Sequence, residues 1–248
     1  MKQNIYDNTN FSTKYDEMRF QKRGYNANDL IEIPNFKKML PDVKGKRILD
    51  LGCGYGEMDL YLKNLGAEYI LGIDLSEHMI NIANKENKKD GVEYRVLAME
   101  DIATITDKFD IIISSLAFHY VEDYNKLLKD IYSLLNKDGY LVFSQEHPLV
   151  TSIILSNDIK HRHTEINNKW VCLVADYNRI GKRISDWNDE AVIKYHRNFS
   201  EIINGLVNNN FKIEEILEPI PSEEAVEKVP KYIHQYDRPY FLFVRAKK

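Results

Sequence analysis

A short apolar strand that runs directly into three alternating glycines constrains this chain more than any other feature. Residues 48–56 read Ile-Leu-Asp-Leu-Gly-Cys-Gly-Tyr-Gly, and the pattern predicts a strand, a sharp turn and then a helix over 57–65. Because glycine has no Cβ, the backbone can bend tightly and a ligand can lie against the peptide planes. The free N–H groups at the start of the helix add hydrogen-bond donors. The arrangement is typical of a nucleotide-cofactor site.

A dinucleotide-binding fingerprint would also place a glycine-rich turn between a strand and a helix. Its third glycine falls where this chain has Glu57. An acidic side chain at a helix N-terminus repels a pyrophosphate but is compatible with a ligand that carries positive charge. The turn therefore disfavours NAD and NADP, although a glycine turn without any ligand stays open.

Strands and helices alternate between residues 46 and 146. Ser76 and Asp123 are candidate N-caps for two of the helices. Alternation of this kind predicts a parallel sheet covered by helices on both faces. The predicted strands are 46–51, 69–73, 92–97, 109–114 and 139–146, and the predicted helices are 57–65, 77–87 and 124–136.

The last third of the chain follows another pattern. A helix at 201–209, introduced by Ser200, precedes strands at 211–218 and 240–246 with no helix between them. We expect these two strands to be antiparallel, so the sheet is mixed. The predicted fold class is therefore α/β, doubly wound and Rossmann-like.

The length of 248 residues suits one such domain with an appended cap better than two doubly wound domains. Residues 1–40 are polar and aromatic and predict an N-terminal helical lid. The α/β domain then occupies 41–248, and the long connection 148–197 is expected to form an inserted cap, because loops of this length are usually functional.

Charge and cysteine content exclude several classes of protein. The formal net charge is -4 and the pI is about 6.0, which disfavours a nucleic-acid partner. Cys53 and Cys172 give neither a disulfide framework nor metal-ligand spacing, so we expect no metal and a reducing, cytoplasmic location. The chain shows no signal peptide and no stretch long enough to span a bilayer, so no membrane partner is expected.

Three later segments continue the pattern of the glycine turn. Asp74 ends the strand 69–73, where a carboxylate can accept both ribose hydroxyls, although this spacing fits NAD as well. The segments 98–101, Ala-Met-Glu-Asp, and 109–120 follow in order. Together with residues 48–57 they resemble class I S-adenosylmethionine-dependent methyltransferases over most of the chain. The resemblance implies S-adenosylmethionine as cofactor and a seven-stranded mixed sheet whose last strand is antiparallel and inserted.

This resemblance assigns the cofactor half of the site, beyond the carboxyl ends of the strands. Asp50 would face the cationic amino and sulfonium groups, Asp74 the ribose, and Met99 the adenine edge. Asp74 could instead cap the turn, and Glu100 and Asp101 could be solvated loop acids. The predicted cofactor-binding residues are Asp50, Gly52, Cys53, Gly54, Gly56, Asp74, Leu75, Met99, Glu100 and Ser115.

The substrate half of the site has fewer sequence signals than the cofactor half, because methyl transfer needs few obligatory side chains. His147 directly follows the strand 139–146, so it and His119 are the candidate catalytic residues; histidine is the natural proton acceptor at neutral pH. Tyr120, Glu146 and His196 are candidate substrate residues. A histidine that only makes structural hydrogen bonds is the alternative in each case.

Segments 144–148, 194–200 and 237–242 resemble a bacterial small-molecule branch related to the ubiquinone and menaquinone methylases. Asn198 stands where that branch has Thr. The resemblance implies transfer of a methyl group to an N or O nucleophile of a small molecule. An RNA or protein methyltransferase and a non-catalytic S-adenosylmethionine-binding protein are the alternatives, and the sequence does not predict an oligomeric state.

Overall fold

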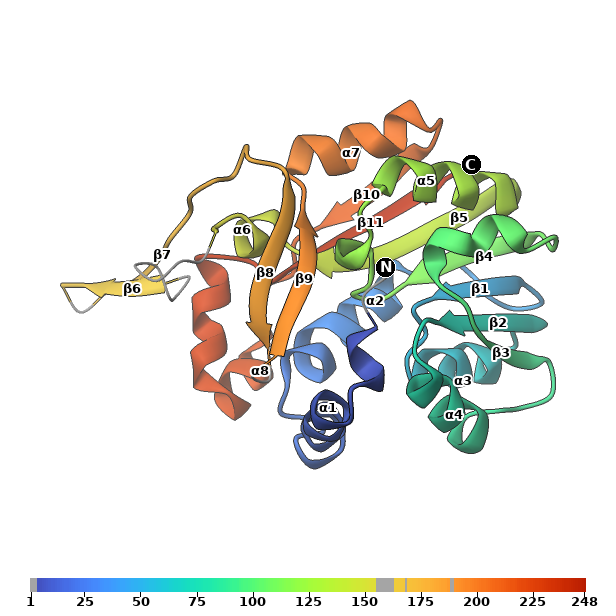
Figure 1. The fold of residues 1–248 in the computed structure, drawn as a ribbon, viewed down its shortest axis with the longest axis horizontal. Coiled ribbons are helices and arrows are strands. Elements are labelled where there is room, and N and C mark those ends of the chain that lie inside the picture. The colour runs from blue at the N-terminus through green and yellow to red at the C-terminus, as the bar shows by residue number, and fades with distance from the viewer. Residues whose placement is uncertain (1–3, 155–162, 168, 188–189) are drawn as a thin grey trace.

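The computed structural model describes residues 4–154, 163–167, 169–187 and 190–248. Its centre is a seven-stranded sheet with strand order β10-β11-β5-β4-β1-β2-β3 (Figure 1). The strands of this sheet are β1 (Arg47–Leu51), β2 (Tyr69–Asp74), β3 (Val92–Val96), β4 (Phe109–Ser114), β5 (Leu135–Glu146), β10 (Lys212–Leu217) and β11 (Phe241–Lys247). The α-helices are α1 (Thr9–Gln21), α2 (Ile33–Met39), α3 (Glu57–Asn64), α4 (Glu77–Glu86), α5 (Tyr124–Leu134), α6 (Pro148–Thr151), α7 (Phe199–Asn208) and α8 (Glu223–Lys228).

The pairing of the strands confirms the predicted mixed sheet. β1, β2, β3, β4 and β5 pair in parallel, whereas β11 lies between β5 and β10 and is antiparallel to both. From β1 the chain runs outward to β2 and β3, and then returns to place β4 on the other side of β1. Reversal of strand order at this point opens a crevice at the carboxyl ends of β1 and β4, where open α/β sheets bind ligands.

Helices cover both faces of the sheet, as Figure 1 shows. On one face α5 and α7 bring Leu128 and Leu206 into a core cluster; on the other, α2, α3 and α4 contribute Phe36, Leu62 and Ile80. All five side chains are buried. The sheet therefore lies between two helical layers, as its alternating pattern predicts, and the crevice is at the carboxyl ends of its strands.

The cap predictions for two helices are confirmed, and one is wrong. Ser76 accepts a hydrogen bond from the N–H of Met79, and Asp123 accepts one from Lys126. The helix expected to begin behind Ser200 instead begins at Phe199, because the side chain of Asn198 accepts from the N–H of Glu201 at 2.9 Å. Asn and Thr are both N-cap residues, so Asn198 fulfils the local role that Thr would have.

The junction between α5 and β5 also differs from its prediction. The helix expected to reach residue 136 ends at Leu134, and the strand expected from 139 begins at Leu135. Leu135 already pairs with Phe109, and the register shifts before Ile111 pairs with Tyr140. Pairing with a neighbouring strand, which local helical periodicity cannot reveal, decides the boundary.

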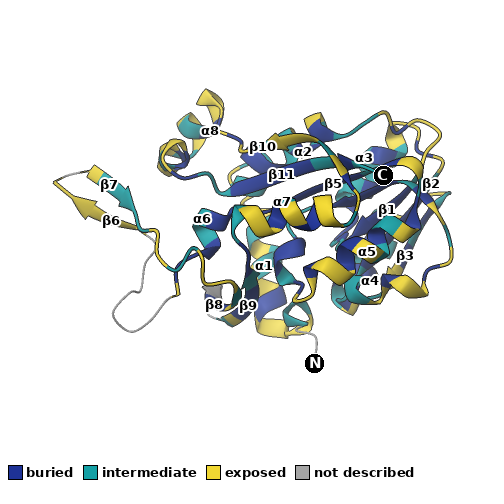
Figure 2. Cartoon of the chain, turned by 90° about the horizontal axis from the view of Figure 1, so that it is seen from above, coloured by how far each residue is buried: buried dark blue, intermediate teal, exposed yellow. Residues whose placement is uncertain are grey.

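The insertion 148–197 contains two hairpins that were not predicted in detail. They are β6 (His163–Ile166) with β7 (Lys169–Cys172) and β8 (Gly181–Trp187) with β9 (Glu190–His196). Residues 155–162, 168 and 188–189 of this insertion lie outside the described residues. The described part of the β6–β7 hairpin projects from the body and is largely exposed (Figure 2). No helix in the described ranges is long and apolar enough to cross a membrane.

Candidate active site

A cavity of about 1210 Å³ lies at the carboxyl ends of β1, β2, β4 and β5. The N-terminal segment and β9 also contribute to its lining. The elements of the N-terminal segment that do so are the 3-10 turn η1 (Ile5–Asp7), the helix α1 and the π-helical turn η2 (Asn28–Glu32). Three predicted site residues, Gly56, His147 and His196, do not line it. The predicted residues that line it are Asp50, Gly52, Cys53, Gly54, Asp74, Leu75, Met99, Glu100, Ser115, His119, Tyr120 and Glu146.

The glycine turn has the geometry expected of a ligand cradle. Gly52, Gly54 and Gly56 have φ of +78°, +53° and +76°, in the left-handed region that favours glycine. A Cβ on Gly54 would meet no atom within 4 Å, so the backbone there borders open space, whereas a Cβ on Gly56 would overlap the hydroxyl of Tyr94. Gly54 therefore leaves room for a ligand, and Gly56 shapes the start of α3.

Asp74 ties the glycine turn to the next helix. Its Oδ2 accepts from the N–H of Gly54 at 3.0 Å, and its Oδ1 accepts from the N–H of Ser76 at 2.9 Å. Burial raises the pKa of this carboxyl, and the two N–H groups oppose the rise. Each carboxylate oxygen can accept a further hydrogen bond. The side chain therefore caps the turn and retains acceptor capacity toward the cavity for ribose hydroxyls.

Two carboxyl groups are buried beneath the turn. Asp50 is 2% exposed and Asp59, on α3, is fully buried. Burial first, and then the negative charge of Asp59, raise the pKa of Asp50 well above its ordinary value. The two carboxyl groups share a hydrogen bond, and no cation contributes to the shift of Asp50 among the described residues. This part of the cavity therefore favours a ligand that brings positive charge.

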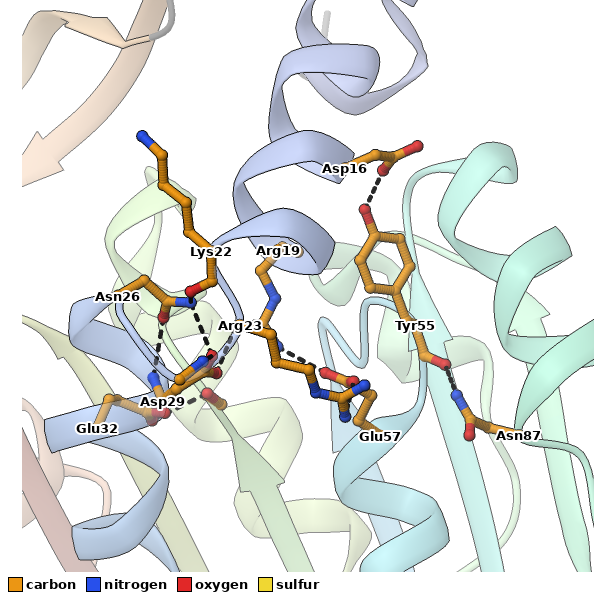
Figure 3. Close-up of polar contacts among 12 residues, drawn as sticks. Asp16, Arg19, Lys22, Arg23, Asn26, Asp29, Glu32, Tyr55, Glu57 and Asn87 are labelled. Atoms are coloured by element: carbon orange, nitrogen blue, oxygen red, sulfur yellow. Dashed lines mark hydrogen bonds and ion pairs between the residues drawn. The ribbon is translucent and has the colours of Figure 1, made fainter.

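The N-terminal segment is fastened over the glycine turn by ion pairs (Figure 3). Arg19 of α1 contacts Asp29 at 3.2 Å and Glu57 at 2.6 Å, and Arg23 contacts Glu57 at 3.0 Å. Glu57, which the sequence presents as a free acid at the start of α3, is therefore neutralised by two arginines. Tyr55 adds a hydrogen bond to Asp16. The charge of Glu57, which disfavours a pyrophosphate here, also binds the N-terminal segment.

A second attachment lies at the N-terminus of α4. Asp7 of η1 accepts from the hydroxyl of Ser76 at 2.5 Å and from the N–H of His78 at 3.1 Å. Partial burial raises the pKa of Asp7, but these hydrogen bonds prevail and hold it below its usual value. A carboxylate at a helix N-terminus is also favoured by the helix dipole. The N-terminal segment thus contacts the starts of both helices that follow the glycine turn and Asp74.

His119 lies on the substrate side of the cavity as a neutral group. It is 4% exposed, and its burial lowers the pKa to about 4. The backbone N–H of Glu146 points at its Nδ1 over 3.4 Å, so we assign the proton to Nε2. In that tautomer His119 donates a hydrogen bond and does not accept a proton at neutral pH. The hydroxyl of the next residue, Tyr120, lies 3.5 Å from the hydroxyl of Tyr6. The carboxylate of Glu146 forms an ion pair with Lys194 at 2.6 Å.

His147 and His196 have structural surroundings. Nδ1 of His147 accepts from the N–H of Leu149 at 3.1 Å, which caps α6, and its Nε2 lies 2.7 Å from Glu218. His196 contacts Thr151 at 2.8 Å and the carbonyl of Tyr177 at 2.9 Å. Because neighbouring side chains at a strand end point to opposite sides, Glu146 lines the cavity and His147 does not. The geometry does not support His147 as a base facing the methyl group, or His196 as a substrate residue.

Several cavity residues were not predicted. Most lie in the N-terminal segment, whose scattered aromatics indicated a lid but no individual contact. The sequence did contain a signal for Glu32. It lies within the apolar run Leu30-Ile-Glu-Ile33, and a glutamate is rarely buried among apolar residues unless it has a partner or a ligand. The unpredicted residues with side chains of interest are Tyr6, Tyr15, Arg19, Glu32, Ile193 and Tyr195.

The cavity fits S-adenosylmethionine on three counts. Its volume of about 1210 Å³ exceeds the usual range for one ligand, so it can hold a cofactor together with an acceptor. The turn at Gly54 leaves backbone open to a ligand. Asp50 and Asp74 offer acidic groups to a cationic molecule that carries a ribose.

Comparison with known proteins agrees with this geometry. Residues 49–143 match the family model described as a methyltransferase domain. A solved S-adenosylmethionine-dependent methyltransferase of Mesorhizobium loti is 34% identical, with a TM-score of 0.80 over 88% of this chain and 97% of that chain. An uncharacterised protein of Haemophilus influenzae is 34% identical over 98% of this chain and 96% of its own length.

A more distant relative is the ubiquinone biosynthesis O-methyltransferase of Bordetella avium, 31% identical over 44% of this chain and 46% of its own length. The matches confirm the resemblance seen in the sequence and agree with a turn that disfavours NAD and NADP. They also identify S-adenosylmethionine as the cofactor and the chain as an enzyme. The chain belongs to the S-adenosylmethionine-dependent methyltransferases.

Proposed function

We propose that this enzyme transfers the methyl group of S-adenosylmethionine to an N or O nucleophile of a small molecule. The observation that carries the proposal is the cavity itself, which the N-terminal segment and β9 enclose beside the cofactor half. The lining of the cavity includes four tyrosines and an isoleucine, Tyr6, Tyr15, Tyr120, Ile193 and Tyr195. Such a wall suits a small planar or lipophilic acceptor, because aromatic side chains supply large apolar faces with a polar edge.

The chain's own residues then have to position the acceptor and exclude water. When bound, the cofactor supplies a methyl group on a positively charged sulfur, already activated for transfer. The attachments of Arg19 to Glu57 and of Asp7 to Ser76 hold the N-terminal segment over the cavity. Closure of this kind removes water from the reacting groups and keeps a nucleophile in line with the methyl group.

His119 is proposed to orient the acceptor. Since its burial keeps it neutral and its Nδ1 faces the N–H of Glu146, its Nε2–H can donate to an oxygen or nitrogen of the acceptor. The hydroxyl of Tyr120, which also lines the cavity, is a second polar group for the acceptor. With this arrangement His119 is an orienting donor, and removal of a proton from the acceptor falls to another group or to water.

An RNA or protein acceptor remains the alternative. The net charge of -4 and the aromatic enclosure of the cavity both favour a small acceptor over a polymer, which would need an open basic groove. The absence of disulfide spacing in the sequence supports a reducing compartment, and we propose the cytoplasm.

The test uses the purified enzyme with S-adenosylmethionine labelled in its methyl group. Three acceptor pools are supplied in parallel: a low-molecular-weight filtrate of a bacterial extract, total RNA and total protein. Label transferred in the filtrate, and reduced in His119→Ala but not in Lys129→Ala, is the expected result. Lys129 is an exposed residue of α5 outside the cavity and serves as the control. Label found only in RNA or protein would contradict the proposal.

A further inference from the structure

Glu32 is a buried acid that faces the cavity from the N-terminal segment. It ends the turn η2, is 1% exposed, and lines the cavity. Its Oε1 accepts hydrogen bonds from the hydroxyl of Ser144 at 2.5 Å and from that of Ser115 at 2.9 Å. These serines come from β5 and from the residue after β4, so the carboxylate is held directly over the crevice of the sheet. A group fixed by two donors in this way is oriented before any ligand arrives.

Glu32 has no cationic partner within the described ranges, where no ion pair involves it. The nearby Arg19 directs its guanidinium to Asp29 and Glu57, as Figure 3 shows. Burial of a carboxylate without a compensating cation is costly. Accordingly, burial raises the pKa of Glu32 to about 7, although the two serine hydroxyls and Arg19 oppose the rise.

A second acid lies close enough to sense this charge. The negative charge of Glu32 contributes to the raised pKa of Asp50, after burial and the effects of Asp59 and Asp74. Both Glu32 and Asp50 line the cavity, and among the described residues the charges that act on Asp50 are those of other acids. Two buried acids that line the same cavity would therefore be stabilised in their charged form by a cationic group of a ligand. Charge-assisted hydrogen bonds of this kind are among the strongest available to a protein.

We propose that Glu32 is the binding site for a ligand ammonium group, and that the methionyl end of S-adenosylmethionine provides it. The cofactor side of the cavity supports this source, because Glu32 is held by Ser115 and lies near Asp50, at the carboxyl ends of β4 and β1. An amine acceptor would present the same chemistry, and the experiment separates the two sources. The inference concerns the cofactor and does not depend on the acceptor.

The test compares two nucleosides that differ at the methionyl end. S-adenosylhomocysteine carries the ammonium group, and 5′-methylthioadenosine lacks the whole amino-acid end. In Glu32→Gln the amide oxygen can still accept from Ser144 and Ser115, so the fold is retained. We expect the dissociation constant of S-adenosylhomocysteine, measured by titration calorimetry, to rise about tenfold to a hundredfold, as for a lost charge-assisted hydrogen bond. Affinity for 5′-methylthioadenosine is expected to stay unchanged.

Glu17→Gln is the matched control, because Glu17 is an exposed acid on the same N-terminal segment and does not line the cavity. It should bind both nucleosides as the wild type does. An equal loss of both nucleosides in Glu32→Gln would overturn the proposal, since it would show a general distortion of the cavity. Unchanged affinity for both would overturn it as well.

A final arm examines the other source of an ammonium group. Benzylamine is titrated into the wild-type and Glu32→Gln complexes with S-adenosylhomocysteine, and the shift in melting temperature is recorded. No stabilisation that depends on Glu32 is expected, because the cofactor already occupies the carboxylate. If only the amine requires Glu32, the assignment to the cofactor is wrong. All of these binding measurements are made without a known acceptor. Failure of the proposed small-molecule methyl transfer would therefore not be mistaken for failure of the proposal for Glu32.

Discussion

Two glycines of the same turn should differ sharply in what an added methyl group costs. Gly54 and Gly56 both have positive φ, of +53° and +76°, so alanine at either site is strained by about 1 kcal/mol. The surroundings differ. A Cβ at Gly54 meets nothing within 4 Å, whereas one at Gly56 overlaps the hydroxyl of Tyr94 and lies 2.6 Å from its Cζ and 2.8 Å from its Cε1.

Tyr94 cannot move aside easily. It is 7% exposed, and its hydroxyl lies 3.4 Å from the carbonyl oxygens of Gly56 and Asn87. Forcing an extra methyl group into such a packed site typically costs 1–3 kcal/mol, so we take about 2 kcal/mol here. Gly56→Ala should therefore lower the free energy of unfolding by about 3 kcal/mol, and Gly54→Ala by about 1 kcal/mol.

The assay is urea unfolding of the protein without cofactor, followed by circular dichroism, with both variants and the wild type measured together. A lower midpoint with an unchanged slope reports stability alone. Equal losses in the two variants would refute the reasoning, because only the contact with Tyr94 distinguishes them. A larger loss at Gly54 would show that this position is packed in solution.

Further predictions concern Asp74, His147 and Glu32. Asp74→Asn should weaken binding of S-adenosylhomocysteine by about 1–3 kcal/mol in calorimetry, since it alters the acceptors available to the ribose; unchanged affinity would remove Asp74 from the site. His147→Ala should lower the free energy of unfolding by about 1 kcal/mol through loss of the α6 cap, while leaving cofactor affinity intact. Lost turnover at unchanged stability would instead restore His147 as a catalytic candidate. Because the pKa of Glu32 is raised from 4.5 to about 7 in the folded protein, its stabilising contribution is full below pH 4.5 and is lost as the pH rises through 7. Relative to Glu32→Gln, the cofactor-free wild type should therefore lose about 2–3 kcal/mol between pH 5 and pH 8 in urea unfolding, and a constant difference would contradict the assignment.

The cofactor half of the site could be predicted because its signals are local. The strand, glycine turn and helix at 47–64 are consecutive in the chain, and Asp74 ends the next strand. Caps such as Ser76 and Asp123 act within three residues of their own position. Patterns of this kind depend on backbone geometry and burial, which the order of residue types already specifies.

The acceptor half could not be predicted, because its properties come from residues far apart in the chain. His147 reads as a base from its place after a strand, yet its ring is held by Glu218, 71 residues away. His119 reads as a proton acceptor, but burial against the end of β5 makes it a neutral donor. A histidine's pKa depends on its solvation and its neighbours, which no local pattern contains.

The sequence by itself determined the doubly wound mixed sheet through the periodicity of its segments. It indicated the family, the cofactor and the inserted last strand through the resemblance of several successive segments to known methyltransferases. The tertiary structure alone decided which side chains surround the ligands. It placed Glu32 against Ser144, 112 residues away, and Arg19 against Glu57, 38 residues away. Burial and charge pairing arise only when such distant segments meet, and they decide which groups are charged, which are neutral and which face the cavity.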